Sequence, residues 1–234
     1  MKVLLFDLDD TLIDYSGGVE RCWEEACAVH CPSAGVDADR LVRALADTRR
    51  WFWNDPERHR RERVNMPQAW RRIAEYALAS VGAPDDDGFA ARLAGEYASR
   101  RRETLDLFPE SLSTLDHFRA RGVSLGLVTN GDASQQRDKI ERFGLAGYFD
   151  VMVIEGEFGA GKPDAIVYRH ALETLGADPS VAAMVGDHLE FDVAGSQRCG
   201  ITGVWIDRRG RGLGLSAVRP HRIVSSLTEL TETT

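Results

Sequence analysis

The chain has 234 residues, of which 43% are hydrophobic and 28% charged, a balance typical of a globular protein with a substantial core. Its net charge of −8 argues against nucleic-acid binding, because phosphate backbones attract basic surfaces. The sequence contains no uninterrupted apolar stretch of about 18 residues, so we expect no membrane span.

The N-terminus and the cysteines predict a cytoplasmic protein. Acidic residues within the first ten positions would interrupt the apolar core of a signal peptide, so we expect reduced thiols. Cys22, Cys27, His30 and Cys31 lie close together in sequence, but no C-x-x-C pair is among them. We therefore interpret these residues as ordinary helix side chains rather than zinc ligands.

The first predicted element is a strand, "KVLLFDL", over residues 2–8, and a long region without strand-like runs follows it. Apolar residues at helical spacing predict amphipathic helices in this region. These helices cover residues 17–31, 38–53, 66–82 and 89–105. We therefore expect a helical insertion, residues 15–105, within a core formed by residues 1–14 and 106–234.

Beyond residue 105, short apolar runs alternate with helical stretches that each end in glycine. The runs are continuous rather than alternating, which is typical of parallel strands covered on both faces. Strands are predicted at residues 123–130, 148–155, 182–187 and 203–207. The alternation predicts an α/β fold, a doubly wound Rossmann-like parallel sheet with an inserted helical domain.

Polar clusters follow apolar runs at four places in the chain. In chain order they contain Asp7 with Asp9, Thr129 with Asn130, Lys162, and Asp187 with Asp192. Each cluster alone has a simpler explanation, such as a turn or a helix cap. Because parallel strands end at the same edge of a sheet, we expect the four clusters to meet there.

Asp7 and Asp9 should point to the same side if the first strand stays extended past Leu8. Two close carboxylates repel each other, so a cation is expected nearby. Their oxygens suit Mg²⁺, and an aspartate can also act as a nucleophile toward phosphorus. A second acid could protonate a leaving alkoxide and then activate water, while Lys162 neutralises the phosphoryl charge.

The four motifs "DLDDT" (7–11), "TN" (129–130), "KP" (162–163) and "GDHLEFD" (186–192) resemble, in order, those of the haloacid dehalogenase-like hydrolases. The resemblance implies that Asp7 is the nucleophile and Asp9 the general acid and base. It also implies that residues 15–105 form the type-one cap of this family.

The same resemblance implies the ligands of the phosphoryl group and the metal. Thr129 and Asn130 would hold the phosphoryl group, and Lys162 would balance its charge. Asp7, the main-chain carbonyl of Asp9, and Asp187 would bind Mg²⁺. Asp192 would lie behind these ligands and steer Lys162 or water on the metal.

Within the family, residues 128–141 and 184–207 are most similar to the N-acylneuraminate 9-phosphatase and pyrimidine nucleotidase branch. Phe191 stands where many members have Asn, which leaves the hydrogen bonding around Asp192 undetermined. The expected function is Mg²⁺-dependent hydrolysis of a small phosphorylated metabolite, a sugar phosphate or a nucleoside monophosphate. The sequence leaves the oligomeric state open.

Three other functions compete with this interpretation. A 2-haloacid dehalogenase needs neither Mg²⁺ nor a second aspartate, because halide leaves without a proton, so Asp9 favours phosphate chemistry. A phosphomutase would use the same nucleophile. A phospho-receiver module, which is not an enzyme, also has an Asp, a Thr and a Lys on a parallel sheet, but it is shorter and has no helical insertion.

The stretch "RRWFWNDPERHRRERVN" (49–65) has two interpretations. It could supply arginines and a tryptophan to a substrate pocket. We favour the alternative, in which Trp51, Phe52 and Trp53 fill the core of the insertion, with one arginine and one of the tryptophans left facing the site. The arginines would then be solvated or paired with Glu57 and Glu62.

Overall fold

The computed structural model describes residues 2–232. The chain divides into two compact units, which we call the core unit (Met1–Tyr15 with Asp106–Thr234) and the helical unit (Ser16–Leu105). Within the described residues, none of the helices combines the length and the apolar character that a membrane crossing requires.

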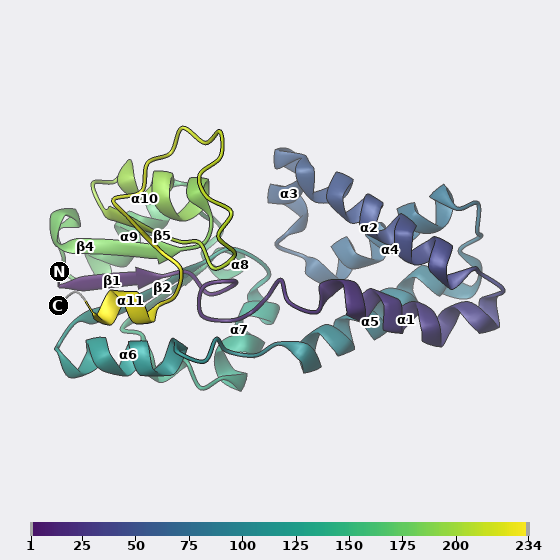
Figure 1. Ribbon diagram of the computed structural model, residues 1–234, viewed down its shortest axis with the longest axis horizontal. Coiled ribbons are helices and arrows are strands. Elements are labelled where there is room, and N and C mark those ends of the chain that lie inside the picture. The colour runs from purple at the N-terminus through teal and green to yellow at the C-terminus, as the bar shows by residue number, and fades with distance from the viewer. Residues whose placement is uncertain (1, 233–234) are drawn as a thin grey trace. The chain divides into compact units, whose positions relative to one another are not determined.

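The core unit is built on a six-stranded parallel sheet in the order β3-β2-β1-β4-β5-β6. Figure 1 labels β1, β2, β4 and β5 of this sheet. The strands are β1 (Val3–Phe6), β2 (Ser124–Thr129), β3 (Val151–Ile154), β4 (Ala182–Gly186), β5 (Thr202–Ile206) and β6 (Arg222–Val224). The strand order reverses between β1 and β4, and open α/β sheets bind ligands at such a point. The predicted α/β fold class is confirmed.

Helices cover the sheet because its strands are apolar on both faces. The helices are α6 (Ser111–Ala120), α7 (Ala133–Arg142), α8 (Glu155–Phe158), α9 (Ala165–Thr174), α10 (Gly195–Gln197) and α11 (Thr228–Thr231). Val167 and Tyr168 of α9 lie in one buried cluster with Val3 and Leu5 of β1. The polar strand ends therefore project from a sheet whose interior is closely packed.

The sixth strand and α8 were not predicted. β6 has only three residues, its central residue Ile223 is exposed, and it lies at the edge of the sheet. α8 is a single turn of four residues. Neither segment is long enough to show the periodicity on which the sequence prediction depends.

The helical unit contains α1 (Val19–Ala34), α2 (Ala38–Asn54), α3 (Pro56–Glu62), α4 (Met66–Ser80) and α5 (Phe89–Thr104). Its interior includes Trp23, which stacks on Tyr97 with ring centroids 3.9 Å apart. Three cysteines of α1 are buried in the same cluster. Helix α3 was not predicted; Asp55 caps it by accepting the N–H of Arg58, and Pro56 occupies its first turn.

The aromatic run in residues 51–53 only partly fills this interior. Phe52 is buried and Trp53 packs partly against the cluster, whereas Trp51 is 52% exposed and does not fill the core. The Arg58 guanidinium lies 3.9 Å from the Trp51 ring centroid and donates to the Phe52 carbonyl.

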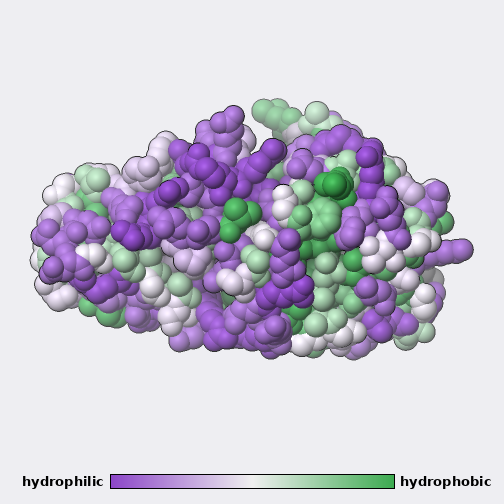
Figure 2. Space-filling model, turned by 180° about the vertical axis from the view of Figure 1, so that it is seen from behind, coloured by the Kyte–Doolittle hydropathy of each residue, from purple (hydrophilic) through white to green (hydrophobic). Residues whose placement is uncertain are grey.

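On the face drawn in Figure 2, hydrophilic residues predominate, with hydrophobic areas between them.

Candidate active site

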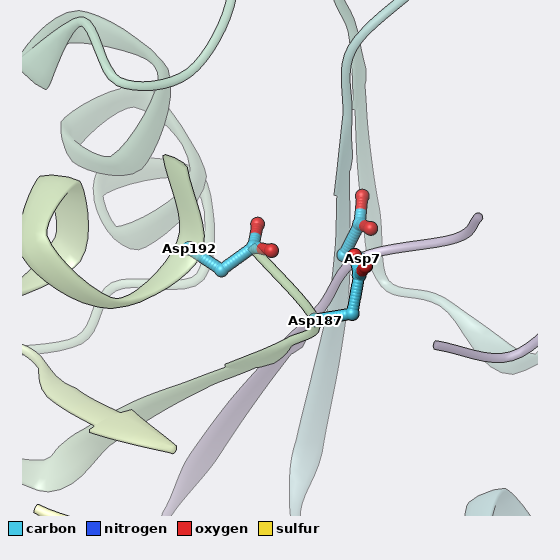
Figure 3. Close-up of side chains that lie close together, drawn as sticks. All are labelled: Asp7, Asp187 and Asp192. Carbon is cyan, nitrogen blue, oxygen red and sulfur yellow. The ribbon is translucent and has the colours of Figure 1, made fainter. Parts of the chain in front are cut away.

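Asp7 and Asp187 follow the two central strands, β1 and β4, at the carboxyl edge of the sheet. Asp192 comes from the short π-helical segment Leu189–Ala194 and points toward them (Figure 3). One carboxylate oxygen from each of the three residues lies within 4.8 Å of the others. The structure thus brings together three acids from the first and fourth motifs.

Lys162 joins two of these acids. Its Nζ donates to Oδ1 of Asp7 and to Oδ1 of Asp192, both at 2.6 Å, and all three side chains are at least nine-tenths buried. Burial alone would lower the pKa of Lys162, but the charges of Asp192 and Asp7 raise it above its ordinary value. The lysine is therefore charged at neutral pH.

One ammonium group does not balance three carboxylates. Burial raises the pKa of Asp7 to about 7, with Lys162 opposing and Asp192 adding to the rise. Burial and the charges of Asp192 and Asp7 raise the pKa of Asp187 to about 8. Buried carboxyl groups with raised pKa values fit a hard divalent cation such as Mg²⁺, because the charge of the ion would relieve the repulsion between the carboxylates.

Asp192 is held from two sides. Its Oδ1 accepts from Lys162, and its Oδ2 accepts the main-chain N–H of His188 at 2.8 Å. Gly186 makes room for it, because a Cβ at that position would overlap the Asp192 carboxyl group. Both oxygens of Asp192 are thus engaged by the protein, which distinguishes this acid from Asp7 and Asp187.

Phe191, the departure from the motif pattern, leaves these bonds to Asp192 intact. Its ring stacks on that of His188 with centroids 3.9 Å apart and an interplanar angle of 11°. Its main-chain carbonyl accepts the hydroxyl of Tyr168. The segment that carries Asp192 is therefore anchored to α9 without the amide side chain that many family members have.

The second motif is tied to the third through Asn130. The side-chain Nδ2 of Asn130 donates to the carbonyl of Lys162 at 2.8 Å, and its Oδ1 accepts the Lys162 N–H at 2.7 Å. The Asn130 amide thus orients the loop that carries the lysine. The Thr129 hydroxyl accepts from Nε2 of Gln136 at 2.6 Å.

Asp9 has a different hydrogen-bond partner from Asp7. The chain turns after Leu8, whose carbonyl accepts the N–H of Ile13, and Asp10 has a left-handed φ of 57°. The Asp9 carboxylate accepts from Nζ of Lys139 at 2.8 and 2.7 Å. Asp7 and Asp9 therefore bind different lysines.

Sequence reasoning missed Gln136, Lys139 and Glu155. Glu155 is buried at the end of β3 and accepts the N–H of Gly131 at 2.9 Å. Gln136 and Lys139 share the buried face of α7 with Ile140, whereas most of this helix is polar. Polar residues at the buried helical spacing, directly after the "TN" motif, are the signal that could have revealed them.

The family model for haloacid dehalogenase-like hydrolases matches residues 1–200. The chain is a haloacid dehalogenase-like hydrolase. It is 35% identical over 226 residues to a phosphoserine phosphatase of Thermus thermophilus, with 89% of each chain covered. It is 29% identical over 249 residues to the mouse N-acylneuraminate-9-phosphatase, covering 98% of this chain and 92% of the relative.

Solved structures of this family share its fold. A 2-haloacid dehalogenase from Pseudomonas syringae is 29% identical, with a TM-score of 0.66 and coverage of 99% of this chain and 97% of that one. The family match confirms the family that the four motifs predicted. It also confirms the prediction that the protein is an enzyme.

Proposed function

We propose that this protein is a Mg²⁺-dependent phosphatase that hydrolyses a small phosphorylated metabolite through an aspartyl-phosphate. The observation that carries the proposal is the buried hydrogen-bonded cluster of the Asp7, Lys162 and Asp192 side chains. Asp187 lies beside this cluster, at the point where the strand order reverses. The names of the phosphoserine and N-acylneuraminate-9-phosphate phosphatases among its relatives support the same reaction class.

In the first half of the proposed reaction, a carboxylate oxygen of Asp7 bonds to phosphorus. The bond between phosphorus and the leaving oxygen breaks, and Asp9 gives its proton to that oxygen. In the second half, water bonds to phosphorus and passes its proton to Asp9, while the bond to Asp7 breaks. The Thr129 hydroxyl and the Lys162 ammonium would hold the phosphoryl oxygens, with the main-chain N–H of Asn130 as a further donor, since the Asn130 amide is occupied.

Asp7, Asp187 and the main-chain carbonyl of Asp9 would hold Mg²⁺. The ion would supply positive charge beside the phosphoryl group, where one lysine faces several acids. Asp192, whose two oxygens already accept hydrogen bonds, would keep Lys162 in place instead of binding the ion.

We further propose that the helical unit (Ser16–Leu105), which the sequence predicted as a cap over residues 15–105, is the cap of the enzyme, and that the core unit is its catalytic core. A cap of this kind excludes water from the reacting groups and contributes to substrate choice. The proposed substrates are sugar phosphates and nucleoside monophosphates. The relatives named above include one that acts on a phosphorylated amino acid, so O-phosphoserine belongs in the same test.

The test is a panel of phosphorylated metabolites with 4-nitrophenyl phosphate, assayed for phosphate release with Mg²⁺ and with EDTA. We expect release only with Mg²⁺, and none from Asp7→Asn. Asp9→Asn should abolish turnover of alkyl phosphates, because the alkoxide then has no proton donor. Chloride release from 2-chloropropionate without Mg²⁺, combined with no phosphate release from any compound, would favour a dehalogenase and refute the proposal.

A further inference from the structure

Asp9 is held by a partly buried ion pair that the proposed reaction does not itself require. Both of its carboxylate oxygens accept from Nζ of Lys139, at 2.8 and 2.7 Å. The Lys139 side chain is only 6% exposed, whereas that of Asp9 is 24% exposed. Because a buried ammonium needs a partner, Lys139 keeps the Asp9 carboxylate in one place.

Lys139 has little freedom of its own. Its Nζ lies 4.3 Å from the centroid of the Tyr15 ring, so aromatic and carboxylate groups both contact the ammonium. It projects from α7, the helix that follows Thr129 and Asn130 directly. The position of the lysine is thus set by the same element that carries the second motif.

Gln136, one helical turn before Lys139, adds a second restraint. Its Nε2 lies 3.1 Å from Oδ2 of Asp9 and 2.6 Å from the hydroxyl of Thr129. It also lies 3.0 Å from the carbonyl oxygen of Asn130. A single buried amide therefore links Asp9 to the residues that would hold the phosphoryl group.

We infer that Lys139 is a positioning residue for Asp9. Together with Gln136 it holds the Asp9 carboxyl group beside Thr129, at the place from which Asp9 exchanges a proton with the leaving oxygen and with water. Lys139 contacts neither the phosphoryl group nor the leaving group and acts only through Asp9. The two catalytic aspartates would then each have their own lysine, Lys162 for Asp7 and Lys139 for Asp9. The inference rests on the proposed function.

If Lys139 had a purely structural role, its replacement would have a different effect on activity. An ion pair that only fastens the loop after β1 to α7 would lower stability when removed, but it would affect every substrate alike. If the general acid is no longer held in position, the enzyme instead cleaves more slowly those substrates whose leaving group needs a proton. The dependence on the leaving group therefore separates the two roles.

The experiment compares phenyl phosphate with 4-nitrophenyl phosphate in a single turnover. The two substrates have similar shapes, but 4-nitrophenolate leaves without a proton more readily than phenolate does. We expect Lys139→Met to slow phenol release by about 100-fold and 4-nitrophenol release by less than about tenfold. In steady-state assays the KM should change little, and Lys139→Arg should restore part of the single-turnover phenol rate.

Arg142→Met, at an exposed position in the last turn of α7, is the matched control and should behave like the unaltered protein. Should Lys139→Met fail to fold, Gln136→Met leaves the ion pair intact and should show the same selective loss to a smaller degree. Equal slowing of both substrates, or unchanged rates, would overturn the inference. Failure of the unaltered protein to cleave either substrate would instead refute the proposed function.

Discussion

The Nζ atom of Lys162 lies 2.6 Å from Oδ1 of Asp7, although 155 residues separate the two in the chain. Both side chains are buried, and the same Nζ also binds Asp192. The ammonium is thus the shared partner of two acids from the first and fourth motifs. Several consequences for stability and activity depend on this arrangement.

Removal of the ammonium should be costly. In Lys162→Met, Asp7 and Asp192 would lose their buried partner, and we expect a loss of about 3–5 kcal/mol of unfolding free energy at neutral pH. Urea denaturation measures this loss. The exposed pair of Arg198 with Glu190 provides the control, because Arg198→Met should cost less than about 1 kcal/mol. Equal costs for the two variants would contradict the special role of Lys162.

The pH dependence of stability follows from Asp187, whose pKa burial raises to about 8. The native state then holds a proton that the unfolded state has already released, so stability without metal falls as the pH rises from about 4 to about 8. Asp187→Asn should remove this part of the fall and raise the melting temperature at pH values above about 8 in EDTA.

Millimolar Mg²⁺ should stabilise the unaltered protein under the same conditions, because an ion that binds only the native state shifts the unfolding equilibrium. Asp187→Asn should lose most of this response, and the exposed variant Glu141→Gln should keep it. Differential scanning calorimetry measures both effects. A full Mg²⁺ response in Asp187→Asn would rule out this residue as a ligand.

Gly186→Ala tests the packing behind the site. The added Cβ would overlap the Asp192 carboxyl group, which should shift that group and the Lys162 it binds. We expect a loss of about 1–3 kcal/mol in stability and up to about 100-fold in kcat. Gly95→Ala in α5 is the control, because nothing lies within 4 Å of its added Cβ. A fully active Gly186→Ala variant would show that Asp192 tolerates displacement.

Glu155 should matter for the loop that follows β2. Its carboxylate accepts the N–H of Gly131 from a buried position, so Glu155→Ala would leave that loop less well held. We expect a fall in kcat/KM of about tenfold for 4-nitrophenyl phosphate. Glu155→Gln, which keeps an acceptor oxygen, should retain most of the activity. If the alanine variant matched the unaltered protein, Gly131 would not need this partner.

The sequence alone was sufficient for the fold class, because continuous apolar runs and helical spacing are local signals that five strands and most helices carry clearly. It also identified the four motifs, since their residue types and order are local properties. It failed for β6, α3 and α8, which are short and depend on neighbours for their stability. Trp51 shows the same limit, since a run of aromatic residues does not reveal which ring faces outward.

The tertiary structure decided which charged groups become partners. Nothing in the residues around Asp7 and Asp9 distinguishes their environments, yet Asp7 meets Lys162 and Asp9 meets Lys139. Likewise, Gln136 and Lys139 belong to none of the four motifs. They lie beside Asp9 because α7 follows β2, and β2 pairs with β1 in the sheet. A sequence records the type and order of ionisable groups, whereas their charge interactions depend on distance and burial, which only packing sets.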